Sequence, residues 1–191
     1  NIPLSLTLGR LSDLDSRTSH TTLISRHVQA LEHKLLGALR ANGFNESIQF
    51  SFTHEAIQLP WCKKENLLRL KKPLSENQAV MRASILPGLL QAIHKNKSYG
   101  VHDVLLFETG HVFSFESKVS ESNSLGMIMT GQTPRSWSQP ARPFDFFDLK
   151  SALVAMLREM PGVLYDLDQN KNPPHWFHPQ ACAEIILNNS L

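Results

Sequence analysis

Two groups of side chains in this sequence have types and spacings that could do chemistry. His175, His178 and Cys182 stand close together in a pattern that a zinc site can use. Asp145 and Asp148 are paired carboxylates, and such a pair can donate and accept a proton in general acid–base catalysis. The first group lacks an evident fourth ligand, and a local turn with a helix cap explains the second better than acid–base catalysis does. We therefore predict structural roles for both groups.

Cations and aromatic rings could instead bind nucleic acid. Basic residues concentrate in one short stretch: Lys63, Lys64, Arg69, Lys71 and Lys72. The stretch could contact RNA or form a solvated strand edge and loop, and the formal net charge of +2 does not demand a nucleic-acid partner. Trp61, Trp137 and Trp176 could stack on RNA bases, although isolated tryptophans are more often core or interface residues. Phosphate-loop, dinucleotide-binding and serine-hydrolase motifs are missing.

The composition is that of an ordinary globular protein. Hydrophobic residues make up 41% of the 191 positions and charged residues 19%. No apolar run reaches the roughly 20 residues that span a membrane, and the N-terminus does not resemble a signal peptide. We expect a cytoplasmic location. Cys62 and Cys182 do not make a disulfide framework, so we expect reduced thiols.

Three helices are expected to frame these side chains. The first, over residues 18–42, repeats apolar residues every three or four positions: Ile24, Val28, Leu31, Leu35 and Leu39. The second covers 84–97, with Ser84 as N-cap and Pro87 in its first turn. The third covers 148–160, with Asp148 as N-cap and an apolar stripe formed by Leu149, Ala152, Leu153, Met156 and Leu157. Gly43 is expected to end the first helix in the left-handed conformation.

Strands are expected between the helices. Ile48, Phe50 and Phe52 alternate with polar residues, which predicts a strand with one buried face. Further strands are expected at 104–108 and 112–115, as a hairpin around Gly110, and at 67–70, 125–130, 164–167 and 182–187. These elements predict an α+β fold with helices packed on an antiparallel sheet. Residues 1–17 are interpreted as an extended lead-in from a preceding domain, and residues 18–191 as one core domain whose C-terminal end is truncated.

Four motifs carry a family resemblance. Pro73-Leu74-Ser75 with the stretch V-M-R-A-S-I-L-P-G-L-L at 80–90 resembles N-P-L-S followed by R-T-S-L-L-P-G-L-L. The segments at 106–113, 145–150 and 178–185 resemble L-F-E-I-G-R-V-F, D-F-F-D-L-K-G and H-P-G-x-x-A-x-I. In this order, the motifs resemble the β-subunit family of bacterial-type phenylalanyl-tRNA synthetases, in its catalytic-like core module. Lys72, Ser151 and Gln180 depart from the usual residues.

The resemblance implies a fold and partners. The fold would be that of class II aminoacyl-tRNA synthetases, an antiparallel sheet flanked by helices. The assembly would be a heterotetramer of two α and two β subunits, in which the α subunit activates phenylalanine and tRNA binds through the whole complex. ATP and magnesium would be used by the complex, with no cofactor, metal or membrane contact in this module.

The resemblance also implies a missing catalytic cation. Class II synthetases grip the α-phosphate of ATP with the arginine of an F-R-x-E motif, and here the matching segment is Phe113-Ser114-Phe115-Glu116. The hydroxyl of Ser114 carries no charge and cannot replace a guanidinium group. The first motif, G-F-x-E-x-x-x-P, has Phe50 in place of its proline, and the third motif is absent. We therefore predict that no residue here is catalytic.

Binding remains as the predicted role. By resemblance, the helix at 18–42 packs between α and β subunits, and the first-motif position that Phe50 fills lies at a dimer contact. The interface candidates are therefore Ile24, Val28, Leu31, Leu35 and Phe50. The alternative is that the helix residues cover their own sheet, and one helix can do both. Two other functions stay open. The chain could be an autonomous ATP-dependent ligase, or a tRNA-binding module that uses the basic residues at 63–72.

Overall fold

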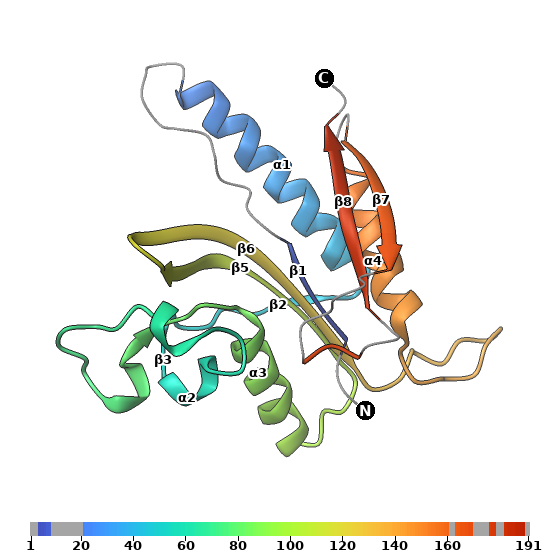
Figure 1. The fold of residues 1–191 in the computed structure, drawn as a ribbon. Helices are drawn as coiled ribbons and strands as arrows, with labels where there is room; N and C mark the ends of the chain where they lie inside the picture. The colour runs from blue at the N-terminus through green and yellow to red at the C-terminus, as the bar shows by residue number, and fades with distance from the viewer. Residues whose placement is uncertain (1–3, 9–20, 161–162, 170–175, 179–181, 190–191) are drawn as a thin grey trace. The chain divides into compact units, whose positions relative to one another are not determined.

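The computed structural model describes residues 4–8, 21–160, 163–169, 176–178 and 182–189 (Figure 1). The chain forms two compact units: Asn1–Arg17 with Gly43–Asp145, and Thr18–Asn42 with Phe146–Leu191. None of the helices in the described part combines the length and apolar character needed to cross a membrane.

The first unit is built on a four-stranded sheet. Its strand order is β1 (Leu4–Leu8), β6 (Val119–Thr130), β5 (Val104–Phe115) and β2 (Asn45–Glu46). The first three strands are antiparallel, and the short β2 runs parallel to β5 (Figure 1). The predicted lead-in therefore contributes a strand to the sheet, because Leu4–Leu8 pairs with β6.

Helix α3 (Leu86–Ser98) covers this sheet with a buried face. Leu86, Leu89 and Ile93 are buried, and Pro87 lies in the first turn as predicted. The Ser84 hydroxyl accepts a hydrogen bond from the Leu86 N–H at 3.2 Å, although Ile85 rather than Ser84 is the N-cap residue. The helix predicted over 84–97 is thus confirmed, with its start moved by two residues.

The predicted hairpin around Gly110 is wrong. Val104–Phe115 is a single strand, and Gly110 pairs with Ser124 in its middle. The turn to β6 comes later, at residues 116–118. A Cβ atom at position 110 would overlap Nη2 of Arg82. Position 110 therefore favours glycine because a side chain approaches the backbone closely there, and not because the backbone reverses direction.

The predicted strand with a buried face at 48–52 is also wrong. Only Phe52–Thr53 (β3) forms a strand there, paired with Val80–Met81 (β4), and the side chains of Ile48 and Phe50 are 88% and 79% exposed. Ser47 N–H still donates to a strand carbonyl, but Gln49 N–H donates to the side chain of Glu108. The Glu108 carboxylate thus takes the place of the backbone carbonyl that would accept this hydrogen bond in a strand, so the regular pairing with β5 ends.

Short helical segments complete the first unit. Helix α2 spans Glu55–Gln58, just before Pro60, and His54 caps it by accepting a hydrogen bond from the Ala56 N–H. Single 3₁₀ turns lie at Lys64–Asn66 and Glu76–Gln78. The strand expected at 67–70 is reduced to one bridge between Arg69 and Val80.

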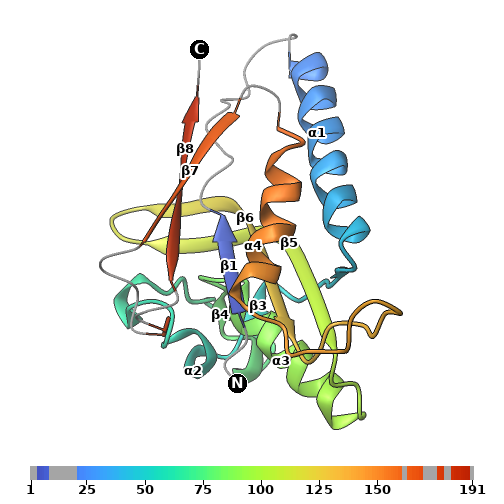
Figure 2. The ribbon, with the colours of Figure 1, turned by 90° about the vertical axis from the view of Figure 1, so that its right-hand side faces the viewer.

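The second unit pairs two helices and a two-stranded ribbon. Helix α1 (Thr21–Ala41) lies beside α4 (Phe146–Leu157), and β7 (Val163–Gln169) is antiparallel to β8 (Ala183–Asn189) (Figure 2). The predicted apolar stripe of α4 is buried: Leu149, Ala152, Leu153, Met156 and Leu157. Asp148 lies inside the first turn and not at the N-cap, where it still complements the helix dipole. The predicted α+β class is confirmed.

Candidate functional site

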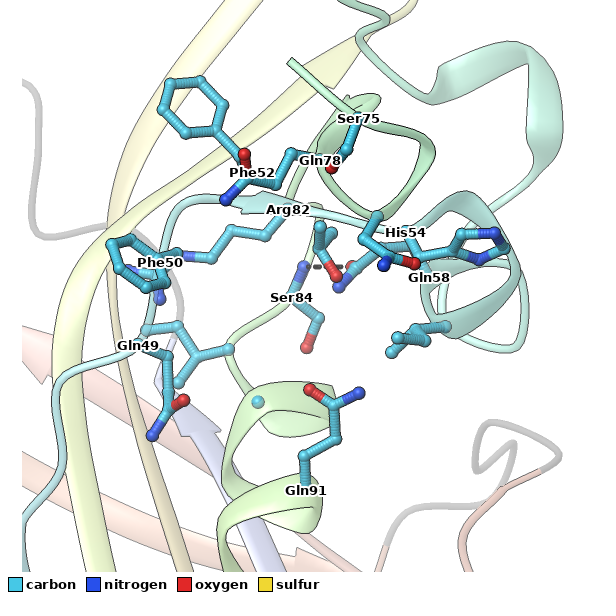
Figure 3. A pocket seen from close by; sticks show the side chains of 15 residues that line it. Gln49, Phe50, Phe52, His54, Gln58, Ser75, Gln78, Arg82, Ser84 and Gln91 are labelled. Carbon is cyan, nitrogen blue, oxygen red and sulfur yellow. Dashed lines mark hydrogen bonds between the residues drawn. The ribbon is translucent and has the colours of Figure 1, made fainter. Parts of the chain in front are cut away.

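A pocket of ≈ 490 Å³ opens in the first unit. It lies between the segment after β2, helix α2, the turn Glu76–Gln78 and the start of α3 (Figure 3). Hydroxyl and amide groups dominate its polar lining: Gln49, Thr53, Gln58, Ser75, Asn77, Gln78, Ser84 and Gln91. Figure 3 shows Gln91 and Ser84 on one side, with Phe50 and Phe52 at the other. Such a lining suits neutral polar groups better than phosphates.

Arg82 is the only permanently cationic side chain among the described residues that line the pocket. It is 5% exposed, and its guanidinium group is already engaged. Nη1 donates to Oε1 of Glu108 at 2.5 Å, and Nε donates to the His111 carbonyl at 2.8 Å. The buried carboxylate neutralises the charge, so the pocket holds no uncommitted guanidinium group for a nucleotide.

The backbone of Arg82 joins two elements of the unit. Its N–H donates to the Ser51 carbonyl at 2.8 Å, and its carbonyl accepts the Phe113 N–H at 2.9 Å. Arg82 therefore follows β4 as a link between the segment before β3 and the strand β5. The side chain crosses β5 above Gly110, which leaves room for it. This residue is primarily a structural tie.

Glu108, on β5, is the counter-ion of Arg82 and is 2% exposed. Its Oε1 atom accepts from Arg82 and from the Gln49 N–H, whereas Oε2 has no hydrogen-bond partner in the described part of the chain. Burial raises the pKa of Glu108, and it outweighs the opposing effect of the hydrogen bond from Arg82. The carboxylate is thus held in place at a cost in desolvation.

This burial predicts a pH dependence of stability. Because the pKa of Glu108 is raised in the folded chain, the folded state binds the proton more tightly than the unfolded state. The stabilisation that comes from protonated Glu108 is fully present below the pKa of this group in the unfolded chain, about 4.3 for glutamate. It is lost as the pH rises through the pKa of Glu108 in the folded chain. We expect the wild-type chain to lose stability relative to Glu108→Gln over that rise, as measured by urea unfolding at several pH values. A flat or rising difference would contradict this assignment.

Gln58 is a buried polar residue that the sequence did not single out. Its Oε1 atom accepts from the Ala83 N–H at 3.0 Å and the Ser84 N–H at 3.2 Å. Helix α2 places it there, and the two bonds hold the chain that leads from Arg82 into α3. Its signal in the sequence was weak, because nothing in a single short helical turn marks one polar side chain as buried.

Ser114 does not line the pocket. It lies near the end of β5, opposite Ser120 of β6, with the turn at 116–118 close by. No cation of the pocket lining takes the place of the arginine that the resemblance leads one to expect there, since Arg82 is bound to Glu108. That Ser114 is not catalytic therefore stays a prediction.

Two cations of the stretch at 63–72 are paired. Lys64 lies 3.4 Å from Glu55, and Arg69 forms a second ion pair with the same carboxylate. The hydrogen bond from Arg69 leads the effects that lower the pKa of Glu55. This arrangement fits the interpretation of the stretch as a solvated strand edge and loop, and a role of these residues in binding RNA stays a prediction.

The interface candidates lie in different surroundings. In α1, Val28 is exposed, Leu31 is half-buried and Leu35 is buried, while the side chain of Ile24 lies outside the described residues. Phe50 is exposed in the first unit, at the edge of the pocket. No partner chain tests these residues, so their interface role stays a prediction.

The remaining chemistry-bearing groups are not assembled into a site within the described part. No cluster of metal-binding side chains occurs there, and the zinc interpretation is not fully tested because His175 lies outside it. His178 is exposed, and both cysteines are free thiols, as expected. Burial raises the pKa of each thiol. Asp145 contacts Arg142 at 3.5 Å, which fits the predicted local turn.

Comparisons with known proteins show which proteins this chain is similar to. Residues 16–191 match the family described as the phenylalanyl tRNA synthetase beta chain CLM domain. The chain is 30% identical to the phenylalanine–tRNA ligase beta subunit of Ehrlichia ruminantium over 84% of its length. This chain is also 31% identical to the phenylalanine–tRNA ligase beta subunit of Geobacter metallireducens, over the full length of this chain. It spans only about a fifth to a quarter of these relatives, 21% and 24%.

A solved structure supports the fold independently. The chain superposes on a pyrrolysyl tRNA synthetase of Desulfitobacterium hafniense with a TM-score of 0.57 and 15% identity, over 79% of this chain and 53% of that one. At this identity the likeness concerns the fold alone, which is that of a class II synthetase core. The family match covers most of the sequence and includes all four motifs. The chain therefore belongs to the family of the phenylalanyl tRNA synthetase beta chain CLM domain.

Proposed function

We propose that this chain is a non-catalytic, synthetase-like module of the β subunit of a phenylalanine–tRNA ligase. It supports assembly with the α subunit, which carries out the ATP-dependent attachment of phenylalanine to tRNA. A heterotetramer with a second β subunit, and work in the cytoplasm where tRNA is charged, fit this role. ATP and magnesium belong to the complex and not to this module.

The ion pair between Arg82 and Glu108 is the observation that carries the proposal. Adenylate formation gathers negative charge on the α-phosphate, and a fixed cation is the usual way to stabilise it. Here the resemblance places Ser114 where that cation belongs, and the one guanidinium group in the pocket lining is bound to Glu108. Loss of one such group costs about 3–4 kcal/mol of transition-state stabilisation.

Pyrophosphate exchange tests the proposal. We expect the chain alone to give no phenylalanine-dependent exchange above background, and to co-purify with the α subunit. The α subunit with this chain should show exchange, and Ser114→Arg should change neither result, because one cation does not rebuild a site. Exchange by the isolated chain would establish the autonomous ligase instead. Failure to bind the α subunit would remove the assembly role.

A further inference from the structure

One buried amide donor in the pocket of the first unit has no partner. Gln58 is 2% exposed, and its Oε1 atom accepts hydrogen bonds from the Ala83 and Ser84 N–H groups. These two bonds determine which end of the carboxamide is the oxygen, so the other end, Nε2, is the donor. Gln58 lines the pocket, yet Nε2 donates to no acceptor in the described part of the chain. The pocket wall therefore offers N–H groups that no described protein atom uses.

The Nε2 atom of Gln58 opens to the pocket and not to the protein interior. Among the described residues that are not exposed, Oε2 of Glu108 is the one polar side-chain atom that is both enclosed and without a hydrogen-bond partner. Since Nε2 of Gln58 also lacks a partner, it is not enclosed, and it reaches the space of the pocket. Figure 3 shows the Gln58 carboxamide beside Ser84. A donor fixed in this way is preordered for an acceptor on a ligand.

The polar lining is rich in carboxamides and has no free permanent cation. Four more carboxamide side chains line the pocket with Gln58: Gln49, Asn77, Gln78 and Gln91. A carboxamide carries both donor and acceptor groups, so this set can match a ligand edge that carries both. Arg82, the one permanent cation in the described lining, is paired with Glu108. The lining therefore favours an uncharged ligand over an anion.

Two phenylalanine rings give the pocket an apolar side. Phe50 and Phe52 line the pocket, and they are 79% and 44% exposed. Exposed rings of this kind bury area when a flat ligand ring stacks on them. The pocket volume of ≈ 490 Å³ lies in the range of small-ligand sites. The rings and the carboxamides together suit a flat, uncharged ring whose edge carries hydrogen-bond donors and acceptors.

We propose that this pocket binds a nucleobase, which stacks on the ring of Phe50 and accepts a hydrogen bond from Nε2 of Gln58. Glutamine and asparagine bind base edges through paired hydrogen bonds, as they do with adenine. The site is separate from the position at which the resemblance leads one to expect adenylate chemistry, because Ser114 does not line the pocket. The inference goes beyond the assembly role in the proposed function and does not depend on it.

Nucleosides without phosphate are the direct probes. We expect adenosine and uridine to bind this chain saturably, with a Kd on the order of 1 mM or tighter. In an isotope-labelled chain, nuclear magnetic resonance can assign the side-chain amide protons of Gln58 through their proximity to the Ala83 and Ser84 N–H groups. These protons should shift during the titration. A titration that leaves them unmoved would overturn the inference.

Phe50→Ala tests the stacking surface. Loss of the ring should weaken nucleoside binding about tenfold, a value in the range measured for one stacked base. Ile48→Ala is the matched control, because Ile48 is 88% exposed in the same segment but does not line the pocket, and it should change affinity less than about twofold. Both side chains are exposed, so both variants should keep the wild-type melting temperature. Equal affinities of Phe50→Ala and the wild type would contradict the stacking and the site with it.

A phosphate group distinguishes this site from a nucleotide site. Because Arg82 is bound to Glu108, adenosine monophosphate should bind within about threefold of adenosine. A gain of more than about tenfold from the phosphate would show a free cation in the pocket, and a nucleotide site would then replace the nucleobase site.

Short single-stranded RNA distinguishes the two sources of a base. Lys71 and Lys72 are exposed, and they lie just before Ser75 of the lining in the sequence. If the base belongs to a strand, an oligonucleotide should bind more tightly than a nucleoside, and salt should weaken that gain. Equal affinities at all salt concentrations would assign the site to a free nucleoside.

The assembled ligase shows whether the pocket stays open beside its partners. Equilibrium dialysis with labelled nucleoside compares wild type and Phe50→Ala in complex with the α subunit, since their difference isolates this pocket from other nucleoside sites. The variant assembly should bind less nucleoside. Equal binding by the two assemblies would mean that another segment fills the pocket, which would overturn the inference and leave the proposed function standing.

Discussion

Replacing Arg82 by alanine is expected to lower the free energy of unfolding by about 3–5 kcal/mol. The change removes the counter-ion of Glu108, which is almost fully buried and whose Oε2 atom already lacks a hydrogen-bond partner in the described part of the chain. It also removes the donor to the His111 carbonyl. At this chain length the melting temperature should fall by roughly 6–20 °C.

A double variant separates the ion pair from simple loss of volume. Arg82→Met with Glu108→Leu removes both charges and keeps apolar bulk, so it should recover part of the stability lost in Arg82→Ala. Urea unfolding of the single and double variants measures the difference. A loss below about 1 kcal/mol in Arg82→Ala would show that the pair contributes little, and the structural role of Arg82 would then be wrong.

The same ion pair bears on the proposal that this synthetase-like module has no active site of its own. The pocket places Arg82 among hydroxyl and amide groups, but Glu108 and the His111 carbonyl use the guanidinium group. A cation that holds β5 to the chain before α3 cannot move to a ligand without loosening the unit. The guanidinium group of Arg82 therefore serves the stability of the first unit.

The sequence predicted the elements whose signals are local. Helix α3 follows from Pro87 near its start and an apolar face, and α4 from the stripe that includes Leu149 and Met156. Caps and periodicity act within a few residues, so they can be recognised without knowledge of the fold. The predicted starts are off by two residues, because the Ser84 hydroxyl binds the Leu86 N–H from the position before the N-cap, and Asp148 complements the helix dipole from inside the first turn of α4.

The errors arose where a distant residue decides the local structure. Gly110 signals a turn in a single sequence, but in the fold it makes room for Arg82, which lies far away in the chain. Alternation of Ile48, Phe50 and Phe52 predicts a buried face, but Glu108 takes the hydrogen bond that would continue the pairing. Propensity and periodicity carry no information on such contacts.

The candidate site was predicted only in part. The resemblance drew attention to Ser114, yet the pocket is organised by Arg82, Glu108 and Gln58, which no motif marks as partners. Opposite charges inside two apolar motifs, M-R-A and F-E-T, were the one signal that could have suggested the pair. Trp137 was weighed as one of three tryptophans, and only its full exposure distinguishes it.

Replacing Gly131 by alanine should cost about 2–6 kcal/mol of stability, because two penalties add. Gly131 has φ of 97°, a left-handed value that costs a residue with a side chain about 1–3 kcal/mol. A Cβ atom there would also lie 2.6 Å from both the Asp103 Cα atom and the His102 carbonyl oxygen. Both are backbone atoms that cannot rotate away, so overpacking adds about another 1–3 kcal/mol.

Gly100→Ala is the matched control for this prediction. Gly100 has φ of 82°, but a Cβ atom there meets nothing within 4 Å, so only the backbone penalty of about 1–2 kcal/mol applies. Urea unfolding of both variants should show the larger loss for Gly131→Ala. Equal losses of stability in the two variants would mean that the backbone of His102 and Asp103 leaves room for a methyl group at position 131, contrary to the distances in the structure.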